Sequence, residues 1–494
     1  MKSIKKLACL LLALTVVFAM AVTVSADDAA ATSTITAPAG STRTYEVYQI
    51  FTADLSEDDA GATVLSNVKW GKNGNGTAGE DVEAAVLEAL AAVNSKSDAE
   101  KMTEIEKHVN LESEKFGEVK DGAPLTVPNG YYLIKDAGPV GEGEAYSKYV
   151  VKIVGDTTIA PKVENVSFEK KIKDTNDTTG VTTGWLDSAD YDIGDAIPFQ
   201  LKGTVAKDFA EYTNAYYFAF HDKAENSLTF SPGSVKVYVD GSQITDGYQL
   251  VTAPTDGCTF DVVFDNLKNV ASVKAGSVIT VEYTAALNEN AVLGKAGNMN
   301  QAKLGYSNNP YTDQHGETNW DNVIAFTYQV VVNKYANSVE VGNEKSGAEF
   351  TLEKVALDGT KTTIAVVKNT EGTTFTFKGL DDGDYILTET VTPAGFNTID
   401  PITFTVTAEH DVQWTTQNRN EVLTSLSGNT DTGEITFTAS EDKDTLSTNV
   451  VNMSGSTLPE TGGIGTTVFY VLGGALVLAA VVLLVTKKRM HSAE

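Results

Sequence analysis

The sequence predicts a mainly β protein. An α+β N-terminal domain precedes tandem β-sandwich domains, with a signal peptide before them and a transmembrane helix after them. From residue 163 to about residue 455, short runs of β-branched and aromatic residues alternate with Gly, Asp and Asn turns. Apolar residues at strong helical spacing are confined, in the exported chain, to residues 77–100. Long uncharged apolar runs stand near both ends of the 494 residues.

The first 26 residues have the layout of a secretory signal peptide. Three lysines precede an apolar run over residues 7–22, and Ala26 ends a small-residue cleavage site. Cys9 lies inside this segment and is lost with it, so Cys258 is the one cysteine left. A single cysteine forms no disulfide within the chain, although an exported protein has access to disulfides.

We expect the first domain to span residues 27–162. A strand pattern over residues 44–51 opens it, and Thr77 with Glu80 fits a capping box ahead of apolar residues at helical spacing. Strand patterns over residues 131–134 and 149–154 close the domain. This mixture of elements predicts an α+β fold.

The next two domains are predicted to be β-sandwiches that span residues 163–322 and 323–457. Strand patterns in the second domain include residues 235–239, 259–264 and 278–283. Those in the third domain are residues 326–332, 350–355, 373–377, 385–390 and 402–406. Short strands between turn signals, with almost no helix, favour two packed sheets.

Charge and motif content exclude several classes of function. The formal net charge is −29 without any long basic run in the exported part, which argues against nucleic acid as a partner. His221 precedes Asp222, but no nucleophile motif accompanies the pair. The acidic loop that starts at Asp174 has Thr179 where a calcium-binding EF-hand needs glycine. We therefore expect no enzyme active site, no bound metal and no cofactor.

The C-terminal residues 458–494 combine three features in a fixed order. They begin with Leu458-Pro459-Glu460-Thr461-Gly462, continue with the uncharged apolar run 468–485 and end with the basic cluster 487–489. The apolar run is long enough to cross a bilayer as a helix, and the basic cluster marks its cytoplasmic side. This order resembles the LPXTG sorting signal of Gram-positive surface proteins. The resemblance implies that a sortase cleaves between Thr461 and Gly462 and joins Thr461 to an amine.

Two predicted strands of the third domain each end an apolar face with a charged residue. Val330 and Val332 share a face with Lys334, and Leu387 shares one with Glu389. Burial disfavours both charges, so the amine and the carboxyl tend towards their neutral forms. Beside an Asn carboxamide, a protonated Glu assists attack by the neutral amine, which gives a Lys–Asn isopeptide bond and ammonia. A buried ion pair without a bond is the alternative.

Residues of the third domain also resemble the collagen-adhesin type B (Cna-B) domain, which has an Ig-like fold. The residues that carry this resemblance are Val330 to Lys334, Ser346 to Leu352 and Tyr385 to Phe396, the last of which resembles the family's E-box. Thr392 and Phe396 replace the usual Ala and Tyr. The resemblance implies an autocatalytic bond from Lys334 to Asn452, with Asn449 as the alternative partner and Glu389 as the acid.

The second domain resembles the isopeptide-forming middle domain of fimbrial shaft subunits. Lys170 shares a strand face with Phe168 and Ile172, so it is preferred over Lys171 as the amine. The resemblance implies that Asn300, in the closing strand, is its partner. The acid is Asp222 or Asp195, and Asp222 is preferred because it follows Phe220 by two positions on an alternating strand.

The whole arrangement resembles a sortase-assembled backbone pilin. In that family a lysine between the first two domains accepts the Thr of the next sorting signal, and Pro161-Lys162 matches the family's motif in part. The resemblance implies pilin-polymerising and housekeeping sortases, further copies of the chain, ancillary pilins and peptidoglycan as partners, at the cell wall or in a fimbrium. A wall-anchored adhesin or ancillary pilin that is not polymerised is the alternative; it differs only in whether Lys162 becomes acylated.

Overall fold

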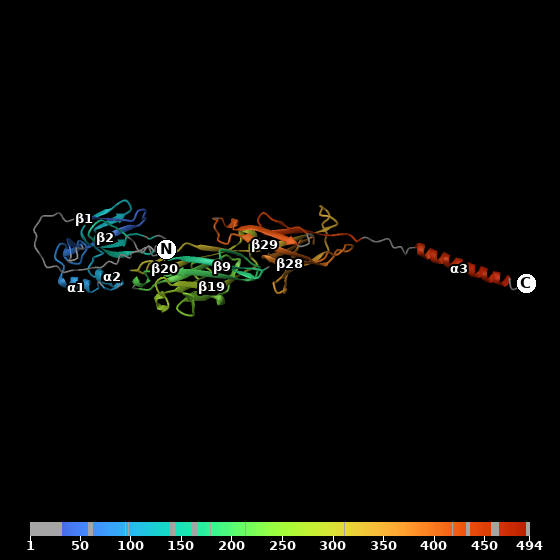
Figure 1. The fold of residues 1–494 in the computed structure, drawn as a ribbon, viewed down its shortest axis with the longest axis horizontal. Coiled ribbons are helices and arrows are strands. Elements are labelled where there is room, and N and C mark those ends of the chain that lie inside the picture. Colours follow the sequence, from blue (N-terminus) through green and yellow to red (C-terminus); the bar gives the residue numbers. More distant parts are fainter. Residues whose placement is uncertain are drawn as a thin grey trace, which may run out of the picture.

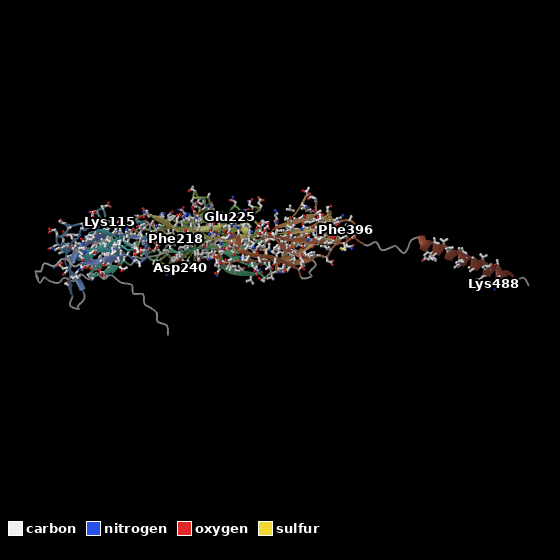
Figure 2. All side chains as sticks on the ribbon, turned by 90° about the horizontal axis from the view of Figure 1, so that it is seen from above. Lys115, Phe218, Glu225, Asp240, Phe396 and Lys488 are labelled. Atoms are coloured by element: carbon white, nitrogen blue, oxygen red, sulfur yellow. The ribbon has the colours of Figure 1, made fainter. Side chains whose placement is uncertain are left out.

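Three β-rich domains lie in a row, and a single helix lies beyond the third domain (Figure 1). This computed structural model describes residues 32–57, 63–93, 95–96, 98–138, 140, 144–159, 166–177, 179–212, 214–310, 312–416, 418–430, 435–455 and 464–490. The predicted signal peptide, Lys162 and the sorting pentapeptide lie outside these residues. A view from above shows the same row, with Lys115 in the first domain and Phe396 at the far end of the third (Figure 2). The predicted mainly β fold is confirmed.

The first domain contains two sheets. One has the order β5-β1-β8 and the other the order β3-β2-β6-β7, with β4 paired to β2. The strands are β1 (Thr32–Thr36), β2 (Thr44–Glu57), β3 (Thr63–Trp70), β4 (Gly117–Lys120), β5 (Leu125–Pro128), β6 (Gly130–Asp136), β7 (Lys148–Ile153) and β8 (Thr157–Thr158).

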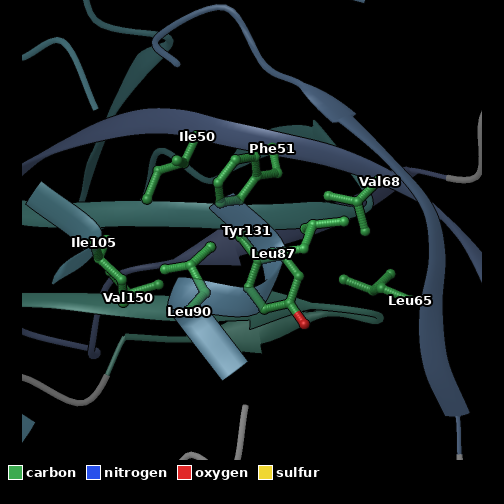
Figure 3. A pocket seen from close by; sticks show the side chains of 9 residues that line it. All are labelled: Ile50, Phe51, Leu65, Val68, Leu87, Leu90, Ile105, Tyr131 and Val150. Carbon is green, nitrogen blue, oxygen red and sulfur yellow. The ribbon is translucent and has the colours of Figure 1, made fainter. Parts of the chain in front are cut away.

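Two short helices, α1 (Ala84–Ala92) and α2 (Asp98–Glu106), pack on the larger sheet. Helix α1 begins after Glu83, whose side chain makes no capping hydrogen bond, so the expected capping box is wrong. Thr77 and Glu80 form a turn instead, because the Glu80 N–H donates to the Thr77 carbonyl at 3.0 Å. The apolar cavity between helices and sheet measures about 20 Å³, which leaves no room for a ligand larger than a water molecule (Figure 3).

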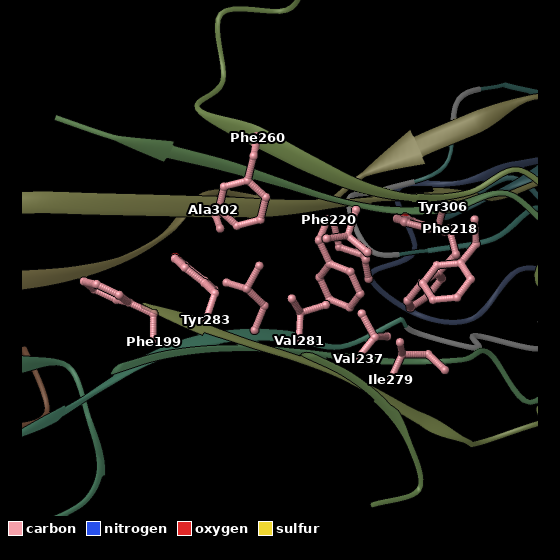
Figure 4. Packing of buried hydrophobic residues seen from close by; sticks show 14 of the residues in the cluster. Phe199, Phe218, Phe220, Val237, Phe260, Ile279, Val281, Tyr283, Ala302 and Tyr306 are labelled. Atoms are coloured by element: carbon pink, nitrogen blue, oxygen red, sulfur yellow. The ribbon is translucent and has the colours of Figure 1, made fainter. Parts of the chain in front are cut away.

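The second domain is a sandwich of two seven-stranded sheets. One has the order β10-β9-β12-β19-β15-β16 with β14 beside β19, and the other has the order β11-β22-β20-β13-β18-β17 with β21 beside β20. The strands are β9 (Phe168–Asn176), β10 (Val181–Leu186), β11 (Ser188–Asp190), β12 (Ala196–Thr204), β13 (Phe218–Ala224), β14 (Leu228–Phe230), β15 (Lys236–Val239), β16 (Ser242–Ile244), β17 (Gln249–Val251), β18 (Phe260–Phe264), β19 (Val278–Leu287), β20 (Asn298–Ser307), β21 (His315–Glu317) and β22 (Asp321–Phe326). Aromatic and aliphatic side chains from both sheets fill the space between them (Figure 4).

The third domain is a smaller sandwich with sheet orders β26-β27-β23-β32-β31 and β25-β24-β28-β29-β30. Its strands are β23 (Tyr328–Ala336), β24 (Glu349–Val355), β25 (Lys361–Ile364), β26 (Val366–Lys368), β27 (Thr374–Leu380), β28 (Gly383–Val391), β29 (Ile402–His410), β30 (Leu423–Thr430), β31 (Thr438–Ala439) and β32 (Thr445–Asn452). The first and last strands, β23 and β32, lie side by side and parallel, and Lys334 is paired with Val450. Strand β22 crosses the boundary expected at residue 322, because it pairs with the second domain while Ile324 and Phe326 pack in the core of the third.

Helix α3 (Ile464–Met490) follows the third domain. Its segment Val468–Lys488 spans 21 residues with a mean hydropathy of 2.8, and none of it is buried against the rest of the protein. Length and apolarity on this scale are what a membrane-spanning helix requires. Short 3-10 turns complete the secondary structure: η1 (Phe209–Glu211), η2 (Pro232–Ser234), η3 (Leu267–Asn269), η4 (Gly294–Ala296) and η5 (Arg419–Glu421).

Candidate functional sites

The second domain buries a lysine between its two sheets. Lys170 lies on β9, and none of its surface is exposed. Its ammonium nitrogen donates to the Tyr283 hydroxyl at 2.7 Å and to a carboxylate oxygen of Asp222, and it lies 5.3 Å from the ring centre of Phe199. Lys171 takes the opposite face, as strand alternation requires, and pairs with Asp187 at 2.5 Å.

The other two groups expected around Lys170 come from the opposite sheet. Asp222 on β13 and Asn300 on β20 are both buried, and their strands are neighbours in which Asn300 is paired with Ala224. Asn300 donates from Nδ2 to the Tyr283 hydroxyl at 3.0 Å. One oxygen of each side chain, Oδ1 of Asp222 and Oδ1 of Asn300, has no hydrogen-bond partner. The three predicted residues therefore meet in one buried space around the Tyr283 hydroxyl.

Burial sets the protonation of this group. Desolvation lowers the pKa of Lys170 below its ordinary value and raises the pKa of Asp222 above its own, although the two groups attract each other when charged. Both directions favour a neutral amine beside a neutral carboxylic acid. The pKa of Tyr283 is raised well above its usual value, mainly by burial, so its hydroxyl keeps its proton.

Sequence reasoning missed Tyr283, whose hydroxyl makes hydrogen bonds to all three predicted residues of the second-domain site. Its hydroxyl accepts from Lys170 and Asn300 and donates to Asp222 at 2.5 Å. The ring stacks on Phe199, with 5.3 Å between ring centres, which fixes its direction (Figure 4). Strand alternation along β19 marks Tyr283 as inward-facing, but nothing in the sequence indicates which strand lies opposite.

Asp195, the alternative acid, is not part of this site. It is exposed in the turn before β12, and it lies with Asp177, Asp192 and Asp381 at the junction of the second and third domains. Partial desolvation of its carboxyl among these neighbours, together with the charge of Asp192, raises its pKa above the ordinary value.

In the third domain, Glu389 and Asn452 face each other across the sandwich. Asn452 is fully buried on β32 and donates from Nδ2 to Glu389 Oε2 at 2.9 Å and to the carbonyl of Asn397 at 2.6 Å. Glu389 lies on β28 of the opposite sheet, and Oε2 also accepts from the Thr392 hydroxyl at 3.2 Å. Thr392 stands where the Cna-B family usually has alanine. The replacement therefore supplies a hydroxyl that donates a hydrogen bond to Glu389.

Lys334 is buried on β23, beside the strand that carries Asn452. Its ammonium donates to the carbonyls of Tyr335 at 3.0 Å and Val450 at 3.2 Å. Among the described residues, no hydrogen bond joins this ammonium to Glu389 or Asn452. The parallel register pairs Lys334 with Val450 and Ala336 with Asn452, so Asn452 lies two positions beyond the residue opposite Lys334. Diagonal neighbours at this spacing are within reach of a long side chain. Burial lowers the Lys334 pKa to about 8, with Glu389 opposing the shift.

Asn449, the alternative partner, points away from Lys334. Its side chain is exposed and accepts from Asn333 at 3.3 Å on the outer face of the sheet. The three-residue offset from Asn452 places the two asparagines on opposite faces of β32.

The second and third domains meet through buried charges. Lys354 of the third domain pairs with Asp177 at 2.5 Å and with Asp192 at 2.6 Å, both from the second domain, and also with Asp381 of its own domain. These carboxylates raise the pKa of Lys354 against the opposing effect of burial, so it stays charged. The lysine is thus the counter-ion of an acidic group drawn from both domains.

A histidine and an arginine extend this junction. His410 of the third domain lies 3.5 Å from Asp174 and 3.7 Å from Asp190 of the second. Burial alone lowers the pKa of His410, but hydrogen bonds to these carboxylates outweigh it and raise the pKa to about 9. Arg419 reaches Glu225 at 2.9 Å, and Glu225 lies between the two domains (Figure 2).

Comparison with known proteins identifies two regions of the chain. Residues 329–420 match the family model of the SpaA prealbumin-like fold domain, and residues 451–492 match that of the LPXTG cell wall anchor motif. Over 420 residues the chain is 23% identical to the trypsin-resistant surface T6 protein of Streptococcus pyogenes serotype M6, with 71% of this chain and 74% of that protein covered. The structure matches the T6 backbone pilin of that serotype with a TM-score of 0.52 at 17% identity, covering 87% of this chain and 100% of that one.

The anchor motif and the apolar helix that follows it define a surface protein of the cell wall. Within that class, the chain resembles the sortase-assembled backbone pilins: it combines a prealbumin-like third domain and an LPXTG anchor with the three-domain fold. The resemblance predicted from the sequence is confirmed.

Proposed function

We propose that the chain is the structural backbone subunit of a sortase-polymerised pilus, stiffened by one intramolecular Lys–Asn bond in each of its last two domains. The observation that carries this proposal is the buried group of Lys170, Asp222, Tyr283 and Asn300, which spans the two sheets of the second domain. A buried Lys–Asp pair alone is a costly way to stabilise a core. An amide placed against it, with its Oδ1 unpaired, gives the pair a chemical role.

The proposed reaction in the second domain transfers the side-chain acyl group of Asn300 from its own amide nitrogen to the amine of Lys170, and ammonia is the leaving group. The neutral amine of Lys170 attacks Cγ of Asn300, while the protonated carboxyl of Asp222 hydrogen-bonds the amide oxygen and stabilises the charge that develops there. The Cγ–Nδ2 bond then breaks, a proton from the attacking nitrogen passes through Asp222 to the leaving group, and ammonia departs. The amine, acid and amide are held in place by the surrounding fold, so orientation is supplied before the reaction starts.

We propose the analogous reaction in the third domain, with Lys334 as the amine, Asn452 as the amide and Glu389 as the acid. Here Glu389 Oε2 accepts a hydrogen bond from the amide nitrogen of Asn452 at 2.9 Å, and the Lys334 amine has further to move than the Lys170 amine. Its two hydrogen bonds are to backbone carbonyls, which a rotation of the flexible lysine stem exchanges for the amide. With a pKa of about 8, Lys334 is partly neutral at physiological pH and able to act as a nucleophile.

Polymerisation is proposed to join Thr461 of one subunit to Lys162 of the next. Lys162 follows Pro161 in the segment between the first and second domains, and proline favours an extended backbone there. A pilin-polymerising sortase would break the Thr461–Gly462 bond and hold Thr461 as an acyl-enzyme, with the segment from Gly462 as the leaving group. The Lys162 amine of another subunit would then attack the acyl-enzyme and free the sortase, and a housekeeping sortase would transfer the last subunit to peptidoglycan.

Expression with the cognate sortase tests this function. A ladder of covalent multimers that survives boiling in detergent is expected from the parent chain, and no ladder is expected from Lys162→Ala. Lys152→Ala is the matched control, because Lys152 lies on strand β7 of the first domain, before Lys162 in the chain. This variant should polymerise normally. Monomer alone from the parent chain would favour the displayed adhesin or ancillary pilin, and a ladder that persists in Lys162→Ala would move the acceptor to another lysine.

A further inference from the structure

A cluster of four potential metal ligands lies on the second domain, away from the interior of the sandwich. His221 on β13 faces Asp261 on β18, which is its paired residue in the sheet. Asp256 and Cys258 belong to the loop that leads from β17 into β18. The imidazole, the thiol and the two carboxylates converge from two neighbouring strands and one loop.

The ligand atoms are already close to a coordinating arrangement. Nδ1 of His221 lies 3.0 Å from Asp261 and 3.1 Å from Asp256, and one nitrogen, one sulfur and two oxygen atoms all lie within 4.8 Å of one another. Zinc bonds of 2.0 to 2.3 Å place neighbouring ligands of a tetrahedral site about 3.5 Å apart. A contraction of about 1 Å, within the freedom of a loop cysteine and a half-exposed aspartate, would therefore close the site.

The cluster differs from the two acidic groups at the domain junction, because those groups already hold a cation. Lys354 occupies one of them and His410 the other. In the part of the chain that the structure describes, no lysine or arginine ion pair is made by Asp256 or Asp261. The nearby Lys303 instead pairs with Glu317 at 2.5 Å and lies 5.0 Å from the ring centre of Trp320.

We propose that His221, Asp256, Cys258 and Asp261 form a binding site for a divalent transition-metal ion of the zinc class. A thiolate and an imidazole are the ligands that such ions prefer, whereas calcium and magnesium select sites made of oxygen alone. Asp261 and His221 are the more buried pair, with 9% and 12% of their side chains exposed, and they form the fixed half of the site. Asp256 and Cys258 form the accessible half, through which the ion enters.

Binding would exchange protons for the metal. In the metal-free protein the two carboxylates disfavour a thiolate beside them, and a bound dication reverses that effect. The thiol proton of Cys258 passes to solvent. The metal also displaces the Nδ1 proton that His221 shares with the two carboxylates, and the imidazole keeps its other proton on Nε2, so Nδ1 presents its lone pair to the metal. The ion would tie the β17–β18 loop to β13, the strand on which the next residue is Asp222. It would also protect the one cysteine of the exported chain from oxidation and from disulfide exchange.

The test is titration of the mature chain, residues 27–461, with Co²⁺ and then Zn²⁺. We expect one equivalent of Co²⁺ to produce the intense near-ultraviolet band of a cobalt–thiolate bond, and one equivalent of Zn²⁺ to abolish it. Zn²⁺ should also slow the reaction of Cys258 with a disulfide reagent. This experiment does not depend on polymerisation or on the isopeptide bonds, so its outcome is separate from theirs.

Variants identify the ligands. Cys258→Ser should remove the cobalt–thiolate band, and His221→Ala should weaken Zn²⁺ binding by more than the roughly 100-fold upper cost of losing an outer-shell partner. Asp265→Asn is the matched control, because Asp265 is an exposed aspartate at the end of the same strand and accepts from Gln249 at 2.7 Å. Its binding should equal that of the parent chain. A parent chain without the thiolate band, or Zn²⁺ affinity unchanged in both ligand variants, would overturn the site.

Discussion

Replacing Lys334 with methionine gives the most direct measure of the proposed third-domain bond. Methionine keeps most of the apolar stem and removes the amine, while Glu389 and Asn452 keep their mutual hydrogen bond. The bond would close a loop of 452 − 334 = 118 residues. By the loop-entropy relation used for disulfides, its loss lowers the free energy of unfolding by about 5 kcal/mol. For a domain of roughly 130 residues this lowers Tm by about 15 to 20 °C.

Other effects of Lys334→Met are too small to imitate that loss. The variant gives up two hydrogen bonds to carbonyls, at about 1 kcal/mol each, and is relieved of the desolvation of a buried amine. Calorimetry of the mature chain gives the Tm of the third-domain transition, and intact mass shows whether one ammonia fewer has been lost. Lys378→Met is the matched control, because Lys378 is exposed on the adjacent strand β27. A Tm within about 5 °C of the parent would refute the stabilising bond.

Three further predictions follow from the sites. Tyr283→Phe removes the hydroxyl that joins Lys170, Asp222 and Asn300, and should slow ammonia loss from the second domain after refolding; unchanged kinetics by mass would contradict its role. His410→Gln should lower the free energy of unfolding most below pH 6.5, and this loss should shrink as pH rises through about 9, because the folded pKa of His410 is raised. Chemical denaturation at pH 6 and 9.5 measures the difference, and a loss that is independent of pH would contradict the prediction. Lys354→Met should loosen the junction and increase proteolysis between the second and third domains; unchanged cleavage would argue against it.

Strand alternation explains why most site residues were within reach of the sequence. Lys170 lies two positions before the buried Ile172, and Lys334 lies two positions after the buried Val332, so their inward direction depends only on the pleat of one strand. The preference for Asn452 over Asn449 did not come from one strand alone. In the sequence, this preference depends on the resemblance to the Cna-B family. In the structure, it depends on the parallel register of β23 and β32.

Most features that sequence reasoning missed depend on contacts between segments that are distant in the chain. Tyr283 is an ordinary inward-facing aromatic residue until β19 is seen opposite β13 and β20 (Figure 4). The expected capping box at Thr77 failed for a related reason, since a local motif was outweighed by the turn that leads from β3 to α1. Alternation along β24 places Lys354 on the inward face, but two of its three carboxylate partners, Asp177 and Asp192, belong to another domain.

The position of the two proposed bonds determines which parts of a subunit would bear tension without covalent protection in the proposed pilus. Between Lys162 and Thr461, the loops closed from Lys170 to Asn300 and from Lys334 to Asn452 contain 130 and 118 residues, which if released would lengthen a subunit by up to about 840 Å. The segment of 33 residues from 301 to 333 lies outside both loops and adds at most about 110 Å. This segment holds β22, which pairs with the second domain and packs on the third, and the ion pairs of Lys354 and His410 flank the same junction. Noncovalent contacts between the domains are therefore concentrated where the proposed bonds leave the chain free to extend.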